Sequence, residues 1–200
     1  GSDIDGDNLS FSLDTDAING SITLDGSLAT YTPDANYSGT DSFIFTVSDG
    51  LETSEATVTL NISAVNDAPV LATVSDVSFD EDGSGSTSLS ASDVDGDDLT
   101  YSISEGTDIT ATLTDSDISF SAPDNFNGSE TFTVSTSDSE FTDSQTITVT
   151  VNAVNDAPVA DATSGLTEED QSIVISLSGS DVDGDNLSFS VQNASNGSVS

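Results

Sequence analysis

The stretch Asp93-Val94-Asp95-Gly96-Asp97-Asp98-Leu99-Thr100-Tyr101-Ser102 decides the organisation of this sequence, because it occurs three times. The other copies are Asp3-Ile4-Asp5-Gly6-Asp7-Asn8-Leu9-Ser10-Phe11-Ser12 and Asp181-Val182-Asp183-Gly184-Asp185-Asn186-Leu187-Ser188-Phe189-Ser190. Successive copies begin 90 and 88 residues apart. A fixed period of this length indicates tandem repeats.

Two further markers have the same period. Val65-Asn66-Asp67-Ala68-Pro69-Val70 returns as Val154-Asn155-Asp156-Ala157-Pro158-Val159, and Tyr37-Ser38-Gly39-Thr40-Asp41-Ser42-Phe43 returns as Phe126-Asn127-Gly128-Ser129-Glu130-Thr131-Phe132; both pairs are 89 residues apart. A unit of this size is long for a solenoid coil and suits a small β-sandwich with its own core.

The Asn-Asp-Ala-Pro segments predict the boundaries, because proline closes a strand. We expect an incomplete first repeat at 1–66 with its start missing, a complete second repeat at 67–155, and the beginning of a third at 156–200. The tail from Gly179-Ser180 repeats the opening Gly1-Ser2, so we expect the 200 residues to be a window on a longer array.

Apolar residues in the complete repeat alternate with polar ones, which is typical of strands with one face in a core. Seven strands are expected, at 74–79, 86–91, 99–104, 109–113, 118–121, 130–136 and 142–153. In the last, Ile147, Val149 and Val151 face the core. No segment shows helical periodicity.

The charge is extreme: 37 Asp and Glu residues and no Lys, Arg or His give a net charge of −37. No internal ion pair can form, and carboxylates about 4 Å apart repel by about 4 kcal/mol in a partly buried setting. Compact acidic clusters therefore need external cations, and hard divalent ions prefer oxygen ligands. The sign of the charge excludes nucleic acid as a partner.

The absence of Cys and Lys excludes disulfides, thiolate metal sites and lysine isopeptide crosslinks. Bound cations are then the remaining means of stiffening small β domains. No signal peptide or membrane-spanning run is visible, so we expect no membrane insertion of this segment and infer export from the calcium requirement.

The Asp-x-Asp-Gly-Asp motif is the sharpest candidate site, because carboxylates two residues apart in a tight loop can converge on one ion. It predicts ligands at Asp3, Asp5, Asp93, Asp95, Asp181 and Asp183. An EF-hand does not fit, because Asp14, Ser104 and Gln192 stand at the twelfth position, where that loop has Glu. A solvated turn is the alternative.

These motifs resemble a known family. Residues 91–103 are similar to the Asp-x-Asp-x-Gly-x-Asn and Tyr-Ser-Ile segment of cadherin repeats, and Val65-Asn66-Asp67-Ala68-Pro69 resembles their linker. Residues 31–50 resemble the cadherin-like tandem repeats of giant, calcium-dependent bacterial surface adhesins. The resemblance covers the chain and implies an all-β fold of cadherin-like (Ig-like) Greek-key sandwiches arranged as a rod.

The resemblance also implies Ca²⁺ at the junctions between repeats. At the first junction the implied ligands are Asp49, Asn66, Asp67, Glu81, Asp82, Asp93 and Asp95. At the second they are Asp138, Asn155, Asp156, Glu169, Asp170, Asp181 and Asp183. The linker is one residue shorter than in cadherins, and the Leu-Asp-Arg-Glu segment is missing.

Some positions leave two interpretations open. Asp41 and Glu130, two residues before an aromatic, are either further ligands or exposed strand residues. The alternating aromatics Tyr37, Phe43, Phe45, Phe126 and Phe132 favour core packing over ligand stacking.

Function follows as a set of expectations. An enzyme is not expected, because a repeated acid cluster without His, Lys, Arg or Cys is typical of a structural site. We expect a calcium-rigidified extracellular spacer or filament of an adhesin, with calcium and neighbouring repeats as partners. The alternatives are a calcium-dependent carbohydrate-binding module for surface polysaccharide, or self-assembly through the edge strand at 57–63.

Overall fold

The computed structural model describes residues 1–192 and 195, and its regular structure consists of β-strands. Contacts divide the chain into two compact units, each described by itself. The first comprises Gly1–Ala72, Ala91–Thr100 and Thr136–Asp143, and the second comprises Thr73–Ser90, Tyr101–Ser135 and Ser144–Ser200. No helix long and apolar enough to cross a membrane occurs among the described residues.

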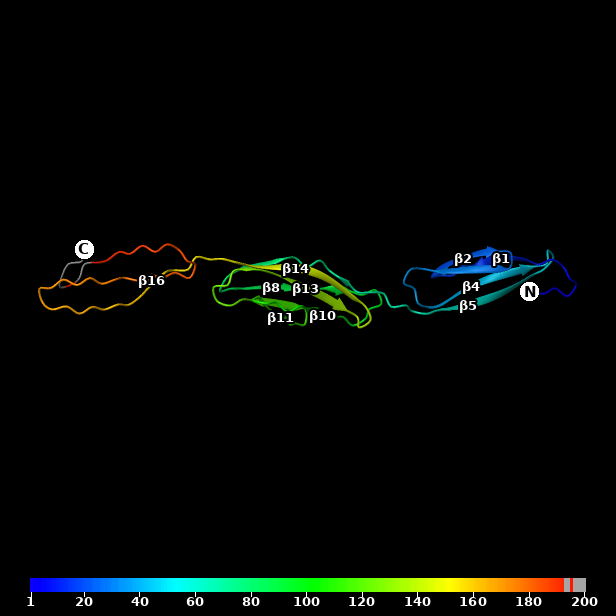
Figure 1. Cartoon of the computed structure of the whole chain (residues 1–200). Coiled ribbons are helices and arrows are strands. Elements are labelled where there is room, and N and C mark those ends of the chain that lie inside the picture. The colour runs from blue at the N-terminus through cyan, green and yellow to red at the C-terminus, as the bar shows by residue number, and fades with distance from the viewer. Residues whose placement is uncertain (193–194, 196–200) are drawn as a thin grey trace. The chain divides into compact units, whose positions relative to one another are not determined.

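The first repeat forms two small sheets from five strands (blue and cyan in Figure 1). The strands are β1 (Ser10–Thr15), β2 (Gly20–Asp25), β3 (Leu28–Pro33), β4 (Gly39–Ser48) and β5 (Thr53–Ile62), in sheets of order β1-β4-β5 and β2-β3. The long hairpin β4–β5 pairs without interruption from Gly39 opposite Ile62 to Ser48 opposite Thr53. Phe43 is buried, and the rings of Phe11 and Phe45 lie 6.3 Å apart.

The second repeat has two sheets of its own, and each contains one strand more than the corresponding sheet of the first repeat. Its strands are β7 (Val77–Asp80), β8 (Ser84–Ser88), β10 (Thr100–Ile103), β11 (Thr110–Thr114), β12 (Asp117–Ser121), β13 (Gly128–Ser137) and β14 (Thr142–Asn152), in sheets of order β10-β13-β14-β7 and β11-β12-β8. Strand β7 pairs in parallel with β14, and β8 pairs antiparallel with β12.

The core of the second repeat lies between these sheets. The rings of Phe120 and Phe132 meet edge to face at 5.4 Å. Ile147, Val149 and Val151 are buried, which confirms the predicted inner face of β14. Each of the seven predicted strands overlaps an observed one, although β7 begins at Val77 rather than at residue 74.

Short ladders flank the sandwiches and were not predicted. Strands β6 (Val70–Leu71) and β9 (Ala91–Ser92) pair antiparallel, as do β15 (Val159–Ala160) and β16 (Gly179–Ser180). Two-residue strands carry no alternation that sequence could reveal. Of the third predicted repeat, residues 193–194 and 196–200 lie outside the described residues. The fold confirms the all-β prediction.

Candidate metal centres at the linkers

The three Asp-x-Asp-Gly-Asp loops share one backbone design. Oδ1 of the first Asp accepts the amide of the residue two positions on, at 2.8 Å for Asp3 and Asp93 and 3.1 Å for Asp181. The glycine of each loop has φ near +80°, a conformation that residues with a Cβ rarely adopt (Gly6 +82°, Gly96 +81°, Gly184 +78°). The first Asp thus shapes the loop with one oxygen and keeps the other for a further partner.

At the first linker, a backbone amide and a side-chain amide each donate a hydrogen bond to a carboxylate of a neighbouring loop. The amide of Asp67 donates to Oδ2 of Asp95 at 2.8 Å, and Nδ2 of Asn66 donates to Oδ2 of Asp138 at 2.8 Å. Carboxylate oxygens of Asp93, Asp95 and Asp97 lie within 4.8 Å of one another. Six oxygen-bearing side chains therefore gather around residues 66–67: Asn66, Asp67, Asp93, Asp95, Asp97 and Asp138.

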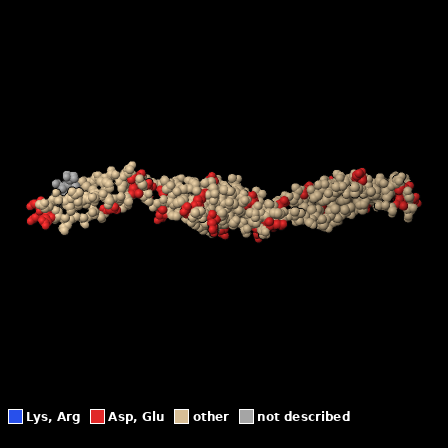
Figure 2. All heavy atoms as spheres, in the orientation of Figure 1, with Lys and Arg blue, Asp and Glu red and all other residues tan. Residues whose placement is uncertain are grey.

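The electrostatics of this first cluster are unfavourable without a cation. Burial raises the pKa of Asp97, and the neighbouring carboxylates of Asp93, Asp95, Asp138 and Asp98 raise it further. Oδ2 of Asp93 is inaccessible to solvent and has no hydrogen-bond partner among the described residues. Figure 2 shows the acidic side chains in red with no Lys or Arg to offset them. A hard cation is the partner that suits such an oxygen.

The second linker repeats this docking. The amide of Asp156 donates to Oδ2 of Asp183 at 2.7 Å, as Asp67 does to Asp95. The buried carboxylate of Glu81 accepts the amide of Val154, and Oδ1 of Asp82 accepts that of Asn125 at 3.0 Å.

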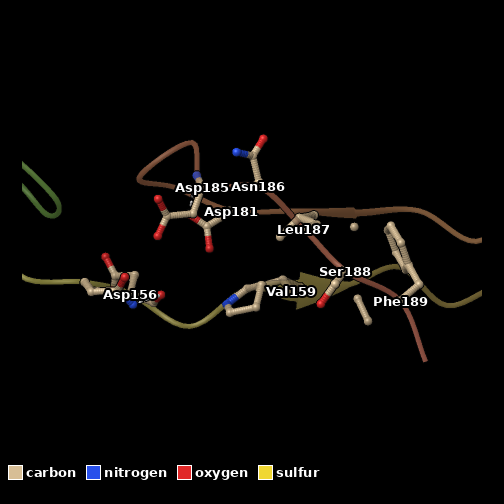
Figure 3. A pocket seen from close by; sticks show the side chains of 12 residues that line it. Asp156, Val159, Asp181, Asp185, Asn186, Leu187, Ser188 and Phe189 are labelled. Carbon is tan, nitrogen blue, oxygen red and sulfur yellow. Dashed lines mark hydrogen bonds between the residues drawn. The ribbon is translucent and has the colours of Figure 1, made fainter. Parts of the chain in front are cut away.

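Oδ2 of Asp156 is a second carboxylate oxygen that is inaccessible to solvent and has no hydrogen-bond partner among the described residues. Burial raises the pKa of Asp156, and then the charges of Asp183, Asp82, Glu81 and Asp181 raise it further. Figure 3 shows Asp156 on the linker segment opposite Asp181 and Asp185 on the loop. Asp156 is thus surrounded by the carboxylates of Glu81, Asp82, Asp181 and Asp183. Among the described residues, the carboxylates whose oxygens lie close enough together to hold one ion are those of Asp93, Asp95 and Asp97 at the first linker.

The structure corrects the predicted grouping of two sets of residues. Glu81 and Asp82, expected at the first linker, lie at the second, because β7 runs parallel to β14 and ends beside Asn152, where that linker begins. Asp138, expected at the second linker, lies at the first, because it occupies the β13–β14 turn at the opposite end of the sandwich.

Asp49 and the pair Glu169 and Asp170 also lie apart from their expected junctions. Asp49 holds the amides of Leu51 and Glu52 in the β4–β5 turn, whereas the first linker leaves from the opposite end of β5. Asp170 has φ +63°, like its counterpart Asp82 at +61°, and both residues lie in turns. Neither Glu169 nor Asp170 is among the charged neighbours that raise the pKa of Asp156.

The remaining predicted residues form hydrogen bonds only with residues close to them in the sequence. Asp3 and Asp5 bond within their own loop, and Asn155 donates from Nδ2 to the carbonyl of Asp156 at 2.7 Å. Sequence reasoning missed Asp97 as a cluster member and Asp185 as its counterpart. Both residues are the third Asp of the Asp-x-Asp-Gly-Asp motif, so the motif itself could have identified them as candidate ligands.

Asp41 and Glu130 prove to be anchors for loops, neither exposed strand residues nor free ligands. Buried Asp41 accepts the amides of Ile18 at 3.2 Å, Asn19 at 2.9 Å and Ser42 at 2.8 Å. Burial would raise its pKa, but these amides and the Tyr31 hydroxyl lower it overall. Burial and the Asp41 carboxylate raise the pKa of Tyr31 to about 12.

Glu130 performs the same role in the second repeat. Its carboxylate accepts the amides of Thr107 at 2.9 Å, Asp108 at 2.7 Å and Ile109 at 3.4 Å. The Asp108 bond is the main reason that the pKa of Glu130 is lowered, against the opposing effect of burial. Both carboxylates are occupied by backbone donors.

The fold and the acidic linkers define a tandem array of Ig-like β-sandwiches. The bacterial Ig domain family matches residues 1–61, 66–150 and 155–200, and the chain therefore belongs to that family. This confirms the predicted Ig-like repeats. No match was found among curated proteins.

The chain is similar to several solved structures. Human protocadherin-24 EC1-2 is 16% identical, with 76% of this chain and 86% of that chain covered and a TM-score of 0.49. Surface layer protein SbsC, domains 1-6, is 16% identical over 76% of this chain and 21% of that one, with a TM-score of 0.37. An endo-fucoidan hydrolase from glycoside hydrolase family 107 is 24% identical over 75% of this chain, with a TM-score of 0.35, and the chain spans 24% of its length.

Proposed function

We propose that this chain is a calcium-rigidified part of an extracellular structural or adhesive array, in which calcium at each linker fixes one repeat against the next. The observation that carries the proposal is the buried, unpartnered Oδ2 of Asp156 within a group of carboxylates. Asp93 gives the same observation at the first linker. The chain has no basic side chain with which to neutralise either cluster.

Calcium is favoured over magnesium by the number and kind of the ligands. Calcium takes six to eight oxygen ligands in flexible geometry, whereas magnesium keeps several waters and uses few protein carboxylates. Asn66, Asp67, Asp93, Asp95, Asp97 and Asp138 would hold the ion at the first linker. Glu81, Asp82, Asp156, Asp181 and Asp183 would hold it at the second. The ion would supply the positive charge that these carboxylates lack.

The mechanical role follows from where the linker is already held. The amides of Asp67 and Asp156 are bonded to the second Asp of the loop that follows each linker. Bringing the remaining carboxylates together without a cation costs free energy through repulsion, so the linker is left loosely fixed. With calcium bound, each linker is restrained at several points and the array becomes a spacer. A catalytic role is no part of this proposal.

The test is calcium binding to the whole chain measured by isothermal titration calorimetry, with small-angle X-ray scattering in calcium and in chelator. We expect binding at the high-micromolar to millimolar affinities of extracellular modules, about 10⁻⁴ to 10⁻³ M, with weaker binding of magnesium. In chelator, scattering should indicate a broad range of maximum dimensions, and in calcium it should indicate a single extended one. If the titration gives no heat of binding and the scattering is the same in calcium and in chelator, the acidic clusters are solvated turns and the proposal is wrong.

Acid should release the calcium. Ligating carboxylates must be deprotonated, and burial and neighbouring charges raise the pKa of Asp97 and Asp156, so protons compete at these positions as pH falls through the raised values. We expect affinity to fall by about tenfold or more between pH 7 and pH 5, with proton release on binding. Calorimetry in buffers of different ionisation enthalpy measures both; equal affinities at the two pH values would contradict the expectation.

A further inference from the structure

Five Asp-Gly pairs follow the first acidic loop, and one of them differs from the rest in its hydrogen bonds. The pairs are Asp25-Gly26, Asp49-Gly50, Asp82-Gly83, Asp95-Gly96 and Asp183-Gly184. An Asp-Gly pair is chemically reactive, because glycine has no Cβ to hinder its nitrogen, which can attack the side-chain carboxyl of the residue before it. The reaction is intramolecular, so the freedom of these two groups to approach each other decides its rate.

In four of the pairs, the glycine nitrogen is held by a hydrogen bond. The bonds are those of Gly50 to Oγ of Ser48 (3.0 Å), Gly83 to the carbonyl of Asp80 (3.1 Å), Gly96 to Oδ1 of Asp93 (3.1 Å) and Gly184 to the carbonyl of Asp181 (3.3 Å). Each bond directs the N–H toward its acceptor and fixes the turn around it. The nitrogen is therefore not free to reach the carboxyl before it.

The carboxylates of the same four pairs are also held, each by at least one backbone amide. Asp49 accepts the amides of Leu51 and Glu52 (2.7 Å each), Asp82 that of Asn125 (3.0 Å), Asp95 that of Asp67 (2.8 Å) and Asp183 that of Asp156 (2.7 Å). Reaction at these pairs requires a local opening that breaks both kinds of hydrogen bond. One bond of ordinary strength lowers the open population by about tenfold, so two lower it by about 100-fold.

Asp25-Gly26 has neither kind of bond. Asp25 lies opposite Leu28 at the end of the β2–β3 ladder, which leaves Gly26 and Ser27 as a two-residue loop. All three residues from Asp25 to Ser27 are exposed, and Gly26 has φ +59° with open space where a Cβ would lie. In the part of the chain that the structure describes, neither the Asp25 carboxylate nor the Gly26 amide has a hydrogen-bond partner.

We propose that Asp25 is a site of spontaneous isoaspartate formation, and that the folded structure protects the other four pairs. The Gly26 nitrogen bonds to Cγ of the neutral Asp25 carboxyl, and the carboxyl OH leaves with the amide proton as water, which gives a cyclic imide. A second water then opens the ring. Opening at Cγ restores Asp25, whereas opening at the backbone carbonyl continues the chain through Cγ and leaves that carbonyl as a free carboxylate.

The product lengthens the chain where its length matters. Isoaspartate adds one methylene to the backbone, and the register of a hairpin depends on the length and geometry of its loop. The Asp25–Leu28 pair and the neighbouring Leu24–Ala29 pair should therefore open. The change is confined to the tip of the β2–β3 hairpin.

Protection matters most in the acidic loops, and this part rests on the proposed function. Asp95 and Asp183 would hold calcium there, and isoaspartate at either position would displace a ligand carboxylate. The glycine amide of each loop is held by the first Asp of that loop, by the side chain of Asp93 and by the backbone of Asp181. Asp93 is thus a positioning residue that also keeps Asp95 intact.

The test is incubation of the whole chain with chelator in water enriched in heavy oxygen, followed by peptide mapping with mass spectrometry. Each passage through the imide leaves one labelled oxygen, whichever carbonyl the water attacks. We expect at least tenfold more label at Asp25 than at any of the other four pairs, and chromatography should separate an isoaspartyl form of the Asp25 peptide. Equal labelling of the five pairs, or no label at Asp25, would overturn the proposal.

Two variants separate the chemistry from the fold. Asp25→Glu keeps the charge but would have to close a larger ring, so label at this pair should disappear. Asp93→Ala removes the acceptor of the Gly96 amide, so label at Asp95 should rise by about tenfold. Unchanged label at Asp95 would overturn its protection by Asp93. Because labelling is measured in chelator, a chain that binds no calcium would count against the proposed function and leave the isoaspartate site standing.

Discussion

Replacing Asp156 with Asn should raise the melting temperature of the chain in chelator and lower it in saturating calcium. Without calcium, the raised pKa of Asp156 shows that its charged form is disfavoured by burial and by Asp183, Asp82, Glu81 and Asp181. A group with a raised pKa stabilises the fold while protonated and loses that contribution as pH rises through the raised value. Asparagine keeps the shape without the charge, so it removes the penalty at neutral pH.

With calcium the same substitution removes a charged ligand. Loss of an outer-shell partner already costs about 10- to 100-fold in metal affinity, and loss of a direct ligand should reach at least the upper end of that range. Because calcium stabilises the folded state by mass action, weaker binding lowers the melting temperature. Scanning calorimetry with chelator and with calcium measures both effects on one protein.

The matched control is Asp117→Asn, which removes one negative charge from an exposed position on β12 outside both clusters. It should shift the melting temperature little under either condition. A change of the same sign in chelator and calcium for Asp156→Asn would show that its carboxylate takes no part in calcium binding.

The sequence predicted the strands of the second repeat well because one face of each is buried. Alternation along β14 appears in the sequence as Ile147, Val149 and Val151, and the structure buries all three. The three loops were predictable for a similar reason, since the glycine at positive φ and the acceptor Asp are local requirements. Features that depend only on residues close together in the sequence can be read from the sequence.

The grouping of the candidate ligands needed the structure. A repeat period gives the distance along the chain between Glu81 and each linker, but not the end of the sandwich at which Glu81 lies. The parallel pairing of β7 with β14 places Glu81 beside Val154. The anchoring roles of Asp41 and Glu130 were equally hidden, because a carboxylate that accepts backbone amides has the same sequence signature as one that faces solvent.

Replacing Phe132 with Ala should destabilise the second repeat by about 3–5 kcal/mol, the usual cost of removing a fully buried aromatic side chain. Phe132 is inaccessible to solvent and packs edge to face on Phe120, so its removal leaves a cavity lined by apolar side chains. Domains of this size are stable by about 5–15 kcal/mol, so much of the stability would be lost. Urea unfolding measures the change.

Phe141→Ala is the control for the same chemistry at the surface. Its side chain is 42% exposed, and the contacts of its backbone with Asp138 and Ser137 do not depend on the ring. We expect a change within about 0.5 kcal/mol. If each repeat has its own core, the Phe132 variant should produce an early unfolding transition for the second repeat while the first repeat unfolds as before. A single transition shifted as a whole would show instead that the repeats unfold together, so that destabilising the second repeat also destabilises the first.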